Sequence, residues 1–136
     1  SVTCDALKHC FLMRTAKTDL DDTMRAVQAE SDPEKKSKIL SAFRLRLRDM
    51  AGRARVKGPL PALERKVAHA AWRVRLDAAL ERGARAERAG DRETELRAYQ
   101  ESLTLLSVPD ASGPFALEQR LRVLRRLEEL DASRSA

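Results

Sequence analysis

The sequence predicts an all-α protein, and three observations lead to that prediction. Ala, Leu, Arg and Glu, which are strong helix formers, dominate the 136 residues. Glycine and proline number only five each and asparagine is absent, so few residues favour turns. Apolar residues repeat every three to four positions along most of the chain. We therefore expect about five antiparallel helices in a bundle or short solenoid-like array, forming a single domain over residues 1–136.

The first helix is predicted over residues 5–30 because apolar residues recur there at helical spacing. Cys10 falls on this stripe, so core packing is its expected role. Asp32 and Pro33 then suit the cap and the first turn of a second helix over residues 33–57. The first stripe consists of Ala6, Cys10, Met13, Ala16, Leu20, Met24 and Val27.

Residues 42–50 alternate apolar and basic side chains, a pattern that also fits an edge strand. The helix is favoured because an apolar stripe continues from Leu40 to Ala54, about four helical turns. A helix turns Leu45 away from Phe43 and Leu47, whereas a strand would keep the three together. The arginines then flank the stripe, with Arg44, Arg48 and Arg55 on one side and Arg46 and Arg53 on the other.

The third helix, predicted over residues 59–89, has apolar residues on two nearly opposite sides. A helix of this kind is usually enclosed by others, so we expect it to be central and Trp72 to be largely buried. The first stripe contains Leu60, Leu63, Val67, Ala70, Ala71, Val74 and Ala78, and the second contains Ala68, Trp72, Leu76, Ala79 and Leu80.

Two shorter helices are predicted over residues 92–107 and 115–131, separated by a Pro- and Gly-containing loop. The last residues, 132–136, are expected to fray. The side chains expected to face the core are Leu96, Tyr99, Leu103 and Leu106 in the first of these helices and Leu117, Leu121, Leu124 and Leu127 in the second.

Residues 79–107 resemble a single tetratricopeptide-type helical hairpin. The matching residues are Gly83, the Gly90-Asp91 turn and Tyr99, followed by Ser102-Leu103. The resemblance implies that small residues let two helices approach closely, that the aromatic ring fills the space between them, and that such hairpins form protein-binding grooves. The sequence departs from the family pattern at Ala79, Arg82, Ala86 and Glu95, and Glu95 stands where the family carries a small alanine.

The net charge of +6 is concentrated in residues 32–58, which carry nine basic and three acidic groups. We expect a module that binds another protein or peptide, acidic ones included, in an inter-helix groove with an arginine rim, because the guanidinium fork suits carboxylates. Nucleic acid is the alternative partner, although aromatic residues for stacking make up only 4%. A third alternative is the soluble domain of a membrane-anchored protein. The candidate binding residues are Arg44, Arg46, Arg48, Arg53, Arg55 and Trp72.

No sequence pattern indicates catalysis, a cofactor or a metal site. Phosphate-binding glycine loops, zinc-protease motifs and nucleophile elbows are absent, so we expect no enzyme activity and assign no catalytic residue. Cys4, His9 and Cys10 have poor spacing for zinc, and Cys4 and Cys10 are too far apart along a helix for a disulfide. Unpaired thiols favour the cytoplasm. We expect no membrane span and see no signal-peptide pattern, and a targeting or anchor segment upstream stays an open alternative.

Overall fold

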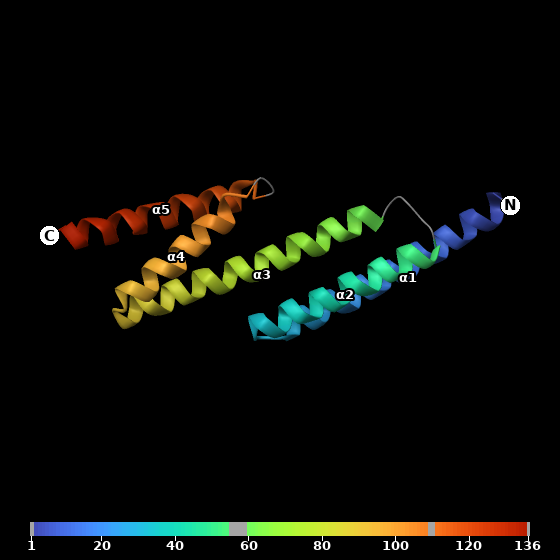
Figure 1. The fold of residues 1–136 in the computed structure, drawn as a ribbon, viewed down its shortest axis with the longest axis horizontal. Helices are drawn as coiled ribbons and strands as arrows, with labels where there is room; N and C mark the ends of the chain where they lie inside the picture. The colour runs from blue at the N-terminus through green and yellow to red at the C-terminus, as the bar shows by residue number, and fades with distance from the viewer. Residues whose placement is uncertain (1, 55–59, 109–110, 136) are drawn as a thin grey trace. The chain divides into compact units, whose positions relative to one another are not determined.

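The all-α prediction is confirmed. The computed structural model describes residues 2–54, 60–108 and 111–135, without the side chains of residues 2–6, 9, 54, 60 and 135, and this part of the chain contains five helices and no strand. Residues 55–57 and 59, which were assigned to helices, lie outside the described residues. The helices are α1 (Val2–Ala29), α2 (Pro33–Ala54), α3 (Leu60–Ala89), α4 (Arg92–Leu106) and α5 (Pro114–Ser135) (Figure 1).

The chain forms two compact units, Ser1–Ala71 and Trp72–Ala136, and the boundary between them falls inside α3. The two apolar stripes predicted on this helix both cross that boundary, although the buried residues named next fall on one stripe in each unit. Leu63 and Val67 are buried in the first unit, and Leu76 and Ala79 are buried in the second. The prediction of a single domain follows from chain length alone, which takes no account of a helix shared by two cores.

In the first unit, α1 and α2 form an antiparallel hairpin and lie side by side (Figure 1). Asp32 caps α2 as predicted, because its carboxylate accepts a hydrogen bond of 3.2 Å from the Glu34 backbone N–H. The core of this unit contains Ala16, Val27, Leu40, Phe43, Leu47, Leu63 and Val67. Its centre therefore lies where α1, α2 and the first half of α3 meet.

The alternating segment 42–50 is helical, as predicted. Phe43 and Leu47 are fully buried, whereas Leu45 is 67% exposed. This separation follows from the helical period, which turns residues two positions apart toward different sides.

Cys10 is exposed, so its predicted place in the core is wrong. The residue lies at the edge of the α1 stripe, whose centre is marked by the buried Ala16 and Val27. A shared spacing of three to four residues thus defines a broad sector, and only its middle is covered by α2 and α3.

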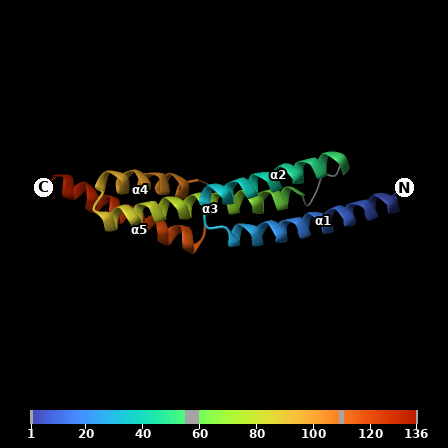
Figure 2. The same cartoon turned by 90° about the horizontal axis from the view of Figure 1, so that it is seen from below.

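The second unit contains the rest of α3 together with α4 and α5 (Figure 2). Gly90 turns the chain after α3 with a φ of 72°, a conformation that L-residues with a side chain rarely adopt. Asp91 then caps α4 by accepting bonds from the Thr94 backbone N–H and hydroxyl, and these bonds lower the pKa of the Asp91 carboxyl. The buried cluster consists of Leu76, Tyr99, Leu106, Ala116 and Val123.

α3 and α4 come close together at Gly83. A Cβ atom at this position would lie 2.5 Å from Cε1 of the Tyr99 ring, a distance that is too short for any real contact. Gly83 is itself buried. The absence of a side chain at residue 83 is therefore what lets the Tyr99 ring pack directly against the α3 backbone.

The face of α5 predicted to be buried is wrong for two of its four leucines. Leu117 and Leu121 are largely exposed, and the buried residues are Ala116, Val123 and Leu130. Leu124 and Leu127, the other two predicted core residues, are half-buried. The buried face is also the one that carries Arg126, which meets a buried carboxylate of α4. The buried face of α5 is therefore turned away from the one predicted from its leucines, and this orientation includes a polar contact that a hydrophobic pattern cannot predict.

The C-terminal residues do not fray where expected, because α5 extends to Ser135. Leu130 is buried, and Arg92 at the start of α4 donates a hydrogen bond of 2.6 Å to the Ser133 hydroxyl. These contacts hold the last turns of α5 against its neighbour. Among the described residues, no helix combines the length and the apolar content needed to cross a lipid bilayer.

Candidate functional site: an open groove between α1 and α2

An open groove of about 780 Å³ lies between the N-terminal part of α1 and the C-terminal part of α2. The register of the hairpin is fixed by Arg46, which donates to the Asp19 carboxylate at 2.9 and 3.0 Å. Extending this antiparallel register places Phe11 opposite Ala54, the last residue of α2. The groove therefore forms beside the last described turn of α2.

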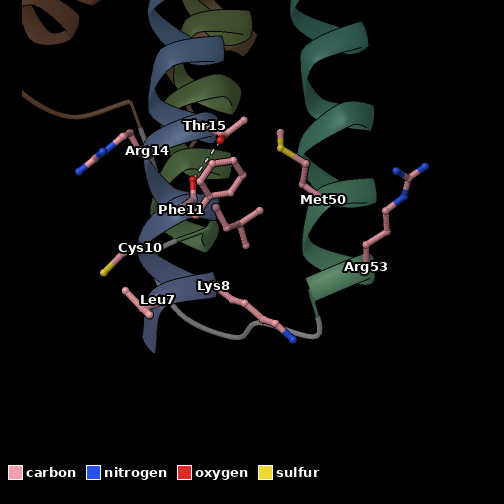
Figure 3. A pocket seen from close by; sticks show the side chains of 9 residues that line it. Leu7, Lys8, Cys10, Phe11, Arg14, Thr15, Met50 and Arg53 are labelled. Atoms are coloured by element: carbon pink, nitrogen blue, oxygen red, sulfur yellow. Dashed lines mark hydrogen bonds between the residues drawn. The ribbon is translucent and has the colours of Figure 1, made fainter. Parts of the chain in front are cut away.

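Apolar side chains form the inner surface of this groove. Phe11 and Met50 point toward one another across the space between α1 and α2 (Figure 3). Phe11 is 74% exposed and Leu7, one turn earlier, is 67% exposed. Large apolar side chains with this exposure, adjacent on one helix face, are a feature of surfaces that bind other molecules.

The charged residues that line the groove are all basic. Lys8 and Arg14 come from α1 and Arg53 from α2, and none of the nine lining residues is acidic. Arg53 also lies 3.3 Å from the Asp49 carboxylate, one turn earlier on α2. The lining residues in the described part of the chain are Leu7, Lys8, Cys10, Phe11, Leu12, Arg14, Thr15, Met50 and Arg53. An apolar floor with a cationic rim is therefore present in the first unit.

Three of the five arginines predicted to form the rim lie elsewhere along α2, and two of these three contact acidic residues. Arg46 pairs with Asp19, and these hydrogen bonds raise the pKa of the Arg46 guanidinium. Arg48 lies 3.6 Å from Glu64 of α3. Arg44 is exposed and makes no ion pair with any residue that the structure describes. These three arginines do not line the groove.

The remaining predicted site residues are in three different situations. Arg53 lines the groove. Arg55 lies outside the described residues. Trp72 belongs to the second unit, where it is half-buried against the apolar cluster and its indole N–H donates a 2.7 Å hydrogen bond to the Leu105 carbonyl. Trp72 therefore has a packing role, close to the burial predicted for it, and has no place in the groove.

A second groove, of about 400 Å³, lies in the second unit and is lined by charged residues of α3 and α5 together with Tyr99. Beside it the Glu95 carboxylate, only 1% exposed, accepts two hydrogen bonds from the Arg126 guanidinium at 2.5 and 3.1 Å. Glu129 and Glu87 lie 3.0 and 3.6 Å from the same guanidinium. These hydrogen bonds raise the pKa of Arg126. Three carboxylates therefore share one arginine, whose positive charge offsets part of their negative charge inside the unit.

Tyr99 adds a hydroxyl group to this cluster. Its hydroxyl donates a hydrogen bond of 3.3 Å to the Glu87 carboxylate. Burial raises the pKa of the Tyr99 hydroxyl, and the negative charges of Glu87 and Glu95 raise it further. The hydroxyl is therefore held in its protonated form, as a hydrogen-bond donor.

No group of three or more His, Cys, Asp or Glu in the described part of the chain is arranged to hold a metal ion. The side chains of Cys4 and His9, which were weighed as ligands, lie outside that part. Cys10 is exposed at the edge of the groove (Figure 3).

Leu7, Phe11 and Arg14 were not predicted as site residues, because the apolar stripe used to predict the core lies on the opposite face of α1. Leu7 and Phe11 are four residues apart, so they share one face of a helix, and that face is away from Ala16 and Val27. An apolar pair outside the core stripe, next to Lys8 and Arg14, was the signal that the sequence contained.

Comparisons of the chain with protein-family models, with curated proteins and with solved structures found no match. The fold and the groove by themselves define the class, an all-α protein with an open, cation-flanked apolar groove between two helices.

Proposed function

We propose that the chain is a non-enzymatic module that binds another protein in the groove between α1 and α2. The observation that carries the proposal is the pair of exposed apolar side chains, Leu7 and Phe11, beside a groove with three basic lining residues. Burying them against a partner would remove their apolar surface from water, which is the main favourable term in protein association. Their neighbours Lys8 and Arg14 would form a polar rim around the contact.

The ion pairs of both units support a role without catalysis. In the second unit, Glu87, Glu95 and Glu129 all form ion pairs with Arg126, so these carboxylates already have a partner within the unit. General acid or base catalysis needs a group that is free to exchange its proton with a substrate. Tyr99, held protonated by burial and by nearby carboxylates, is equally unsuited to act as a base.

The tetratricopeptide-type resemblance of residues 79–107 is also part of the proposal. It is supported by the contact of the Tyr99 ring with Gly83 and by the left-handed turn at Gly90. Glu95, buried where that family has a small residue, is the departure, and Arg126 of α5 accommodates its charge. A reducing compartment such as the cytoplasm is the expected location, supported by the exposed free thiol of Cys10.

The proposal is tested by comparing proteins captured from the source cells by three forms of the chain, with nuclease added throughout. The forms are the wild type, a groove variant Phe11→Asp, and a control Leu45→Asp. The control is matched because Leu45 is also a largely exposed apolar residue but lies outside the groove. We expect a captured protein that the groove variant loses and the control keeps. Capture that is independent of Phe11, or that nuclease abolishes, would contradict the proposal.

A further inference from the structure

We propose that the occupant of the α1–α2 groove is an amphipathic helix of a partner protein, with an apolar face that covers Leu7 and Phe11 and with acidic residues along its edges. This inference rests on the proposed function and specifies the chemistry of the partner. Four features carry it: the length of the apolar surface, its position at the end of the hairpin, the charges around it, and its poor fit to other occupants.

The length of the groove suits about two turns of helix. From Leu7 to Thr15 the α1 backbone rises about 12 Å, at 1.5 Å per residue. A helix that lies along α1 presents anchors at positions i, i+4 and i+7 over the same distance. Leu7, Phe11 and Met50 supply apolar surface for such anchors, and Met50 does so from the opposite wall. Methionine adapts its shape to different partners, which favours this use.

The position of the groove indicates a helical occupant. Farther along the hairpin, α2 packs against α1 through buried residues such as Phe43, Leu47 and Ala16. Near Phe11 the register places the last described turn of α2, so among the described residues no part of α2 continues alongside the first turns of α1. A helix from a partner would continue the helix-against-helix packing that the rest of the unit already uses.

The basic residues around the groove indicate that the partner helix carries acidic residues along its edges. Lys8, Arg14 and Arg53 lie around the apolar surface, and none of the described lining residues carries a carboxylate. Of these three cations, Arg53 is the one that forms an ion pair with a described residue, Asp49. A partner helix with glutamate or aspartate beside its apolar face would form charge-assisted hydrogen bonds here. A helix with lysine or arginine at the same positions would place like charges together, which disfavours binding.

Two other occupants fit less well. An amphipathic helix that binds a membrane surface needs a continuous apolar face, but the outward face of α1 continues with the polar residues Thr15 and Thr18, whose hydroxyls bond to their own helix backbone. A second copy of this chain that docked groove to groove would bring Lys8 and Arg14 against the same cations of its partner. Both occupants are therefore disfavoured by side chains of the groove itself.

The test uses three synthetic helical peptides of about 16 residues, somewhat over four turns. The acidic peptide has leucines at i, i+4 and i+7 with glutamates beside them. The basic peptide has lysines in place of those glutamates. The third peptide has the acidic composition with its leucines distributed around the helix. Fluorescence anisotropy measures the Kd of each for the full chain at about 0.15 M salt, and again at about 0.5 M salt, where surface charges are more strongly screened.

We expect the acidic peptide to bind at least about tenfold more tightly than either of the others, with a Kd that rises with salt. Phe11→Asp should weaken this binding by at least about tenfold, the effect expected of a hot-spot anchor, while Leu45→Asp should leave it within about twofold. The variant Lys8→Glu with Arg14→Glu should reverse the preference between the acidic and basic peptides. Circular dichroism checks that each variant keeps its helix content.

Cys10 provides a second measurement at the groove edge. In the background Cys4→Ser, Cys10 is the one remaining thiol in the 136-residue sequence, and it is exposed. Binding of the acidic peptide should slow its reaction with a maleimide. An unchanged labelling rate at saturating peptide would place the binding elsewhere and overturn the inference.

The outcomes separate this inference from the proposed function. If the basic peptide binds as well as the acidic one and Phe11→Asp weakens both, the charge specificity is wrong while the groove function stands. If no peptide binds but capture from cells depends on Phe11, a helical acidic occupant is wrong and the function again stands. Binding to anionic vesicles that requires Phe11, or a dimer that Phe11→Asp dissociates, would overturn both in favour of a membrane or a second copy.

Discussion

At the scale of single residues, the buried ion pair of Glu95 and Arg126 constrains how the second unit packs. Glu95 is almost fully buried, and both its carboxylate oxygens accept hydrogen bonds from Arg126. A buried carboxylate that loses its partner is costly because neither water nor protein then stabilises its charge. The pair therefore holds α4 against α5 in one relative rotation, the rotation that buries Val123 and exposes Leu121.

Arg126→Met is expected to lower the free energy of unfolding by about 2–3 kcal/mol, somewhat below the cost at a fully buried pair because the Arg126 side chain is partly solvated. Urea denaturation followed by circular dichroism measures the change. Arg125→Met is the control, since Arg125 is exposed and should have little effect. The double variant Glu95→Leu with Arg126→Met removes both charges and should recover most of the loss. A double variant as unstable as the sum of its single variants would show that the two residues do not act as a pair.

Tyr99 gives a second prediction, on pH. It is the only tyrosine in the sequence, so tyrosinate absorbance reports this hydroxyl alone. Burial and the nearby carboxylates raise its pKa above the usual 10.0, so titration of the native protein should have a midpoint above that of the urea-unfolded chain. A pKa that is higher in the folded state contributes stability below about pH 10, and this contribution is lost as pH rises through the folded pKa. Tyr99→Phe should remove that part of the alkaline destabilisation. Equal midpoints in the native and unfolded states would contradict the prediction.

At the scale of helices, two glycines inside helices should respond oppositely to the same substitution. Gly83→Ala places a methyl group 2.5 Å from the Tyr99 ring and should lower the free energy of unfolding by about 1–3 kcal/mol. Gly52→Ala in α2 meets nothing within 4 Å and should raise that free energy by up to about 1 kcal/mol, since alanine is the better helix former. Both changes are measured by urea denaturation. A stabilising Gly83→Ala would mean that the Tyr99 ring has room to move away from α3.

The helices themselves could be predicted from sequence, but their buried faces only in part. Composition, Asp32 and Gly90 locate helix ends because capping and left-handed turns are local. The inward face of α5 could not be read from its leucines, because the partner of Arg126 lies 31 residues away in the chain. The periodicity of a helix shows which residues lie together and does not show which set another helix will cover.

The type of candidate site could be predicted from the sequence, but its location in the fold could not. An inter-helix groove with basic residues at its edge was expected, and Arg53 is the one predicted arginine that lines it. Its location depends on where α2 ends relative to α1, and that register is set by the contact of Arg46 with Asp19 between two helices. The apolar residues at the groove, Leu7 and Phe11, are ones that a search for the core passes over because they face outward.

At the scale of the whole molecule, the net charge of +6 does not show which cations are available to a polyanion, because several basic side chains, those of α2 among them, lie beside carboxylates. On α2, three arginines lie within 4 Å of carboxylates: Arg46 at Asp19, Arg48 at Glu64 and Arg53 at Asp49. A phosphate would have to compete with these carboxylates for the same guanidinium groups. The exposed cations of α2 that make no ion pair with a described residue are Lys35, Lys38 and Arg44.

We therefore expect weak binding to nucleic acid, with a Kd no better than about 10⁻⁴ M for mixed-sequence duplex DNA near physiological salt, the weak end of nonspecific binding. If DNA bound to α2 alone, its three exposed cations without an ion pair would give a shallow salt dependence, with a log–log slope of about −2.7 at most. A titration with fluorescent oligonucleotides at several salt concentrations measures both quantities. Submicromolar affinity at about 0.15 M salt, lost in Arg44→Ala with Arg48→Ala, would mean that phosphates displace the carboxylates and that the basic surface of α2 is the functional one.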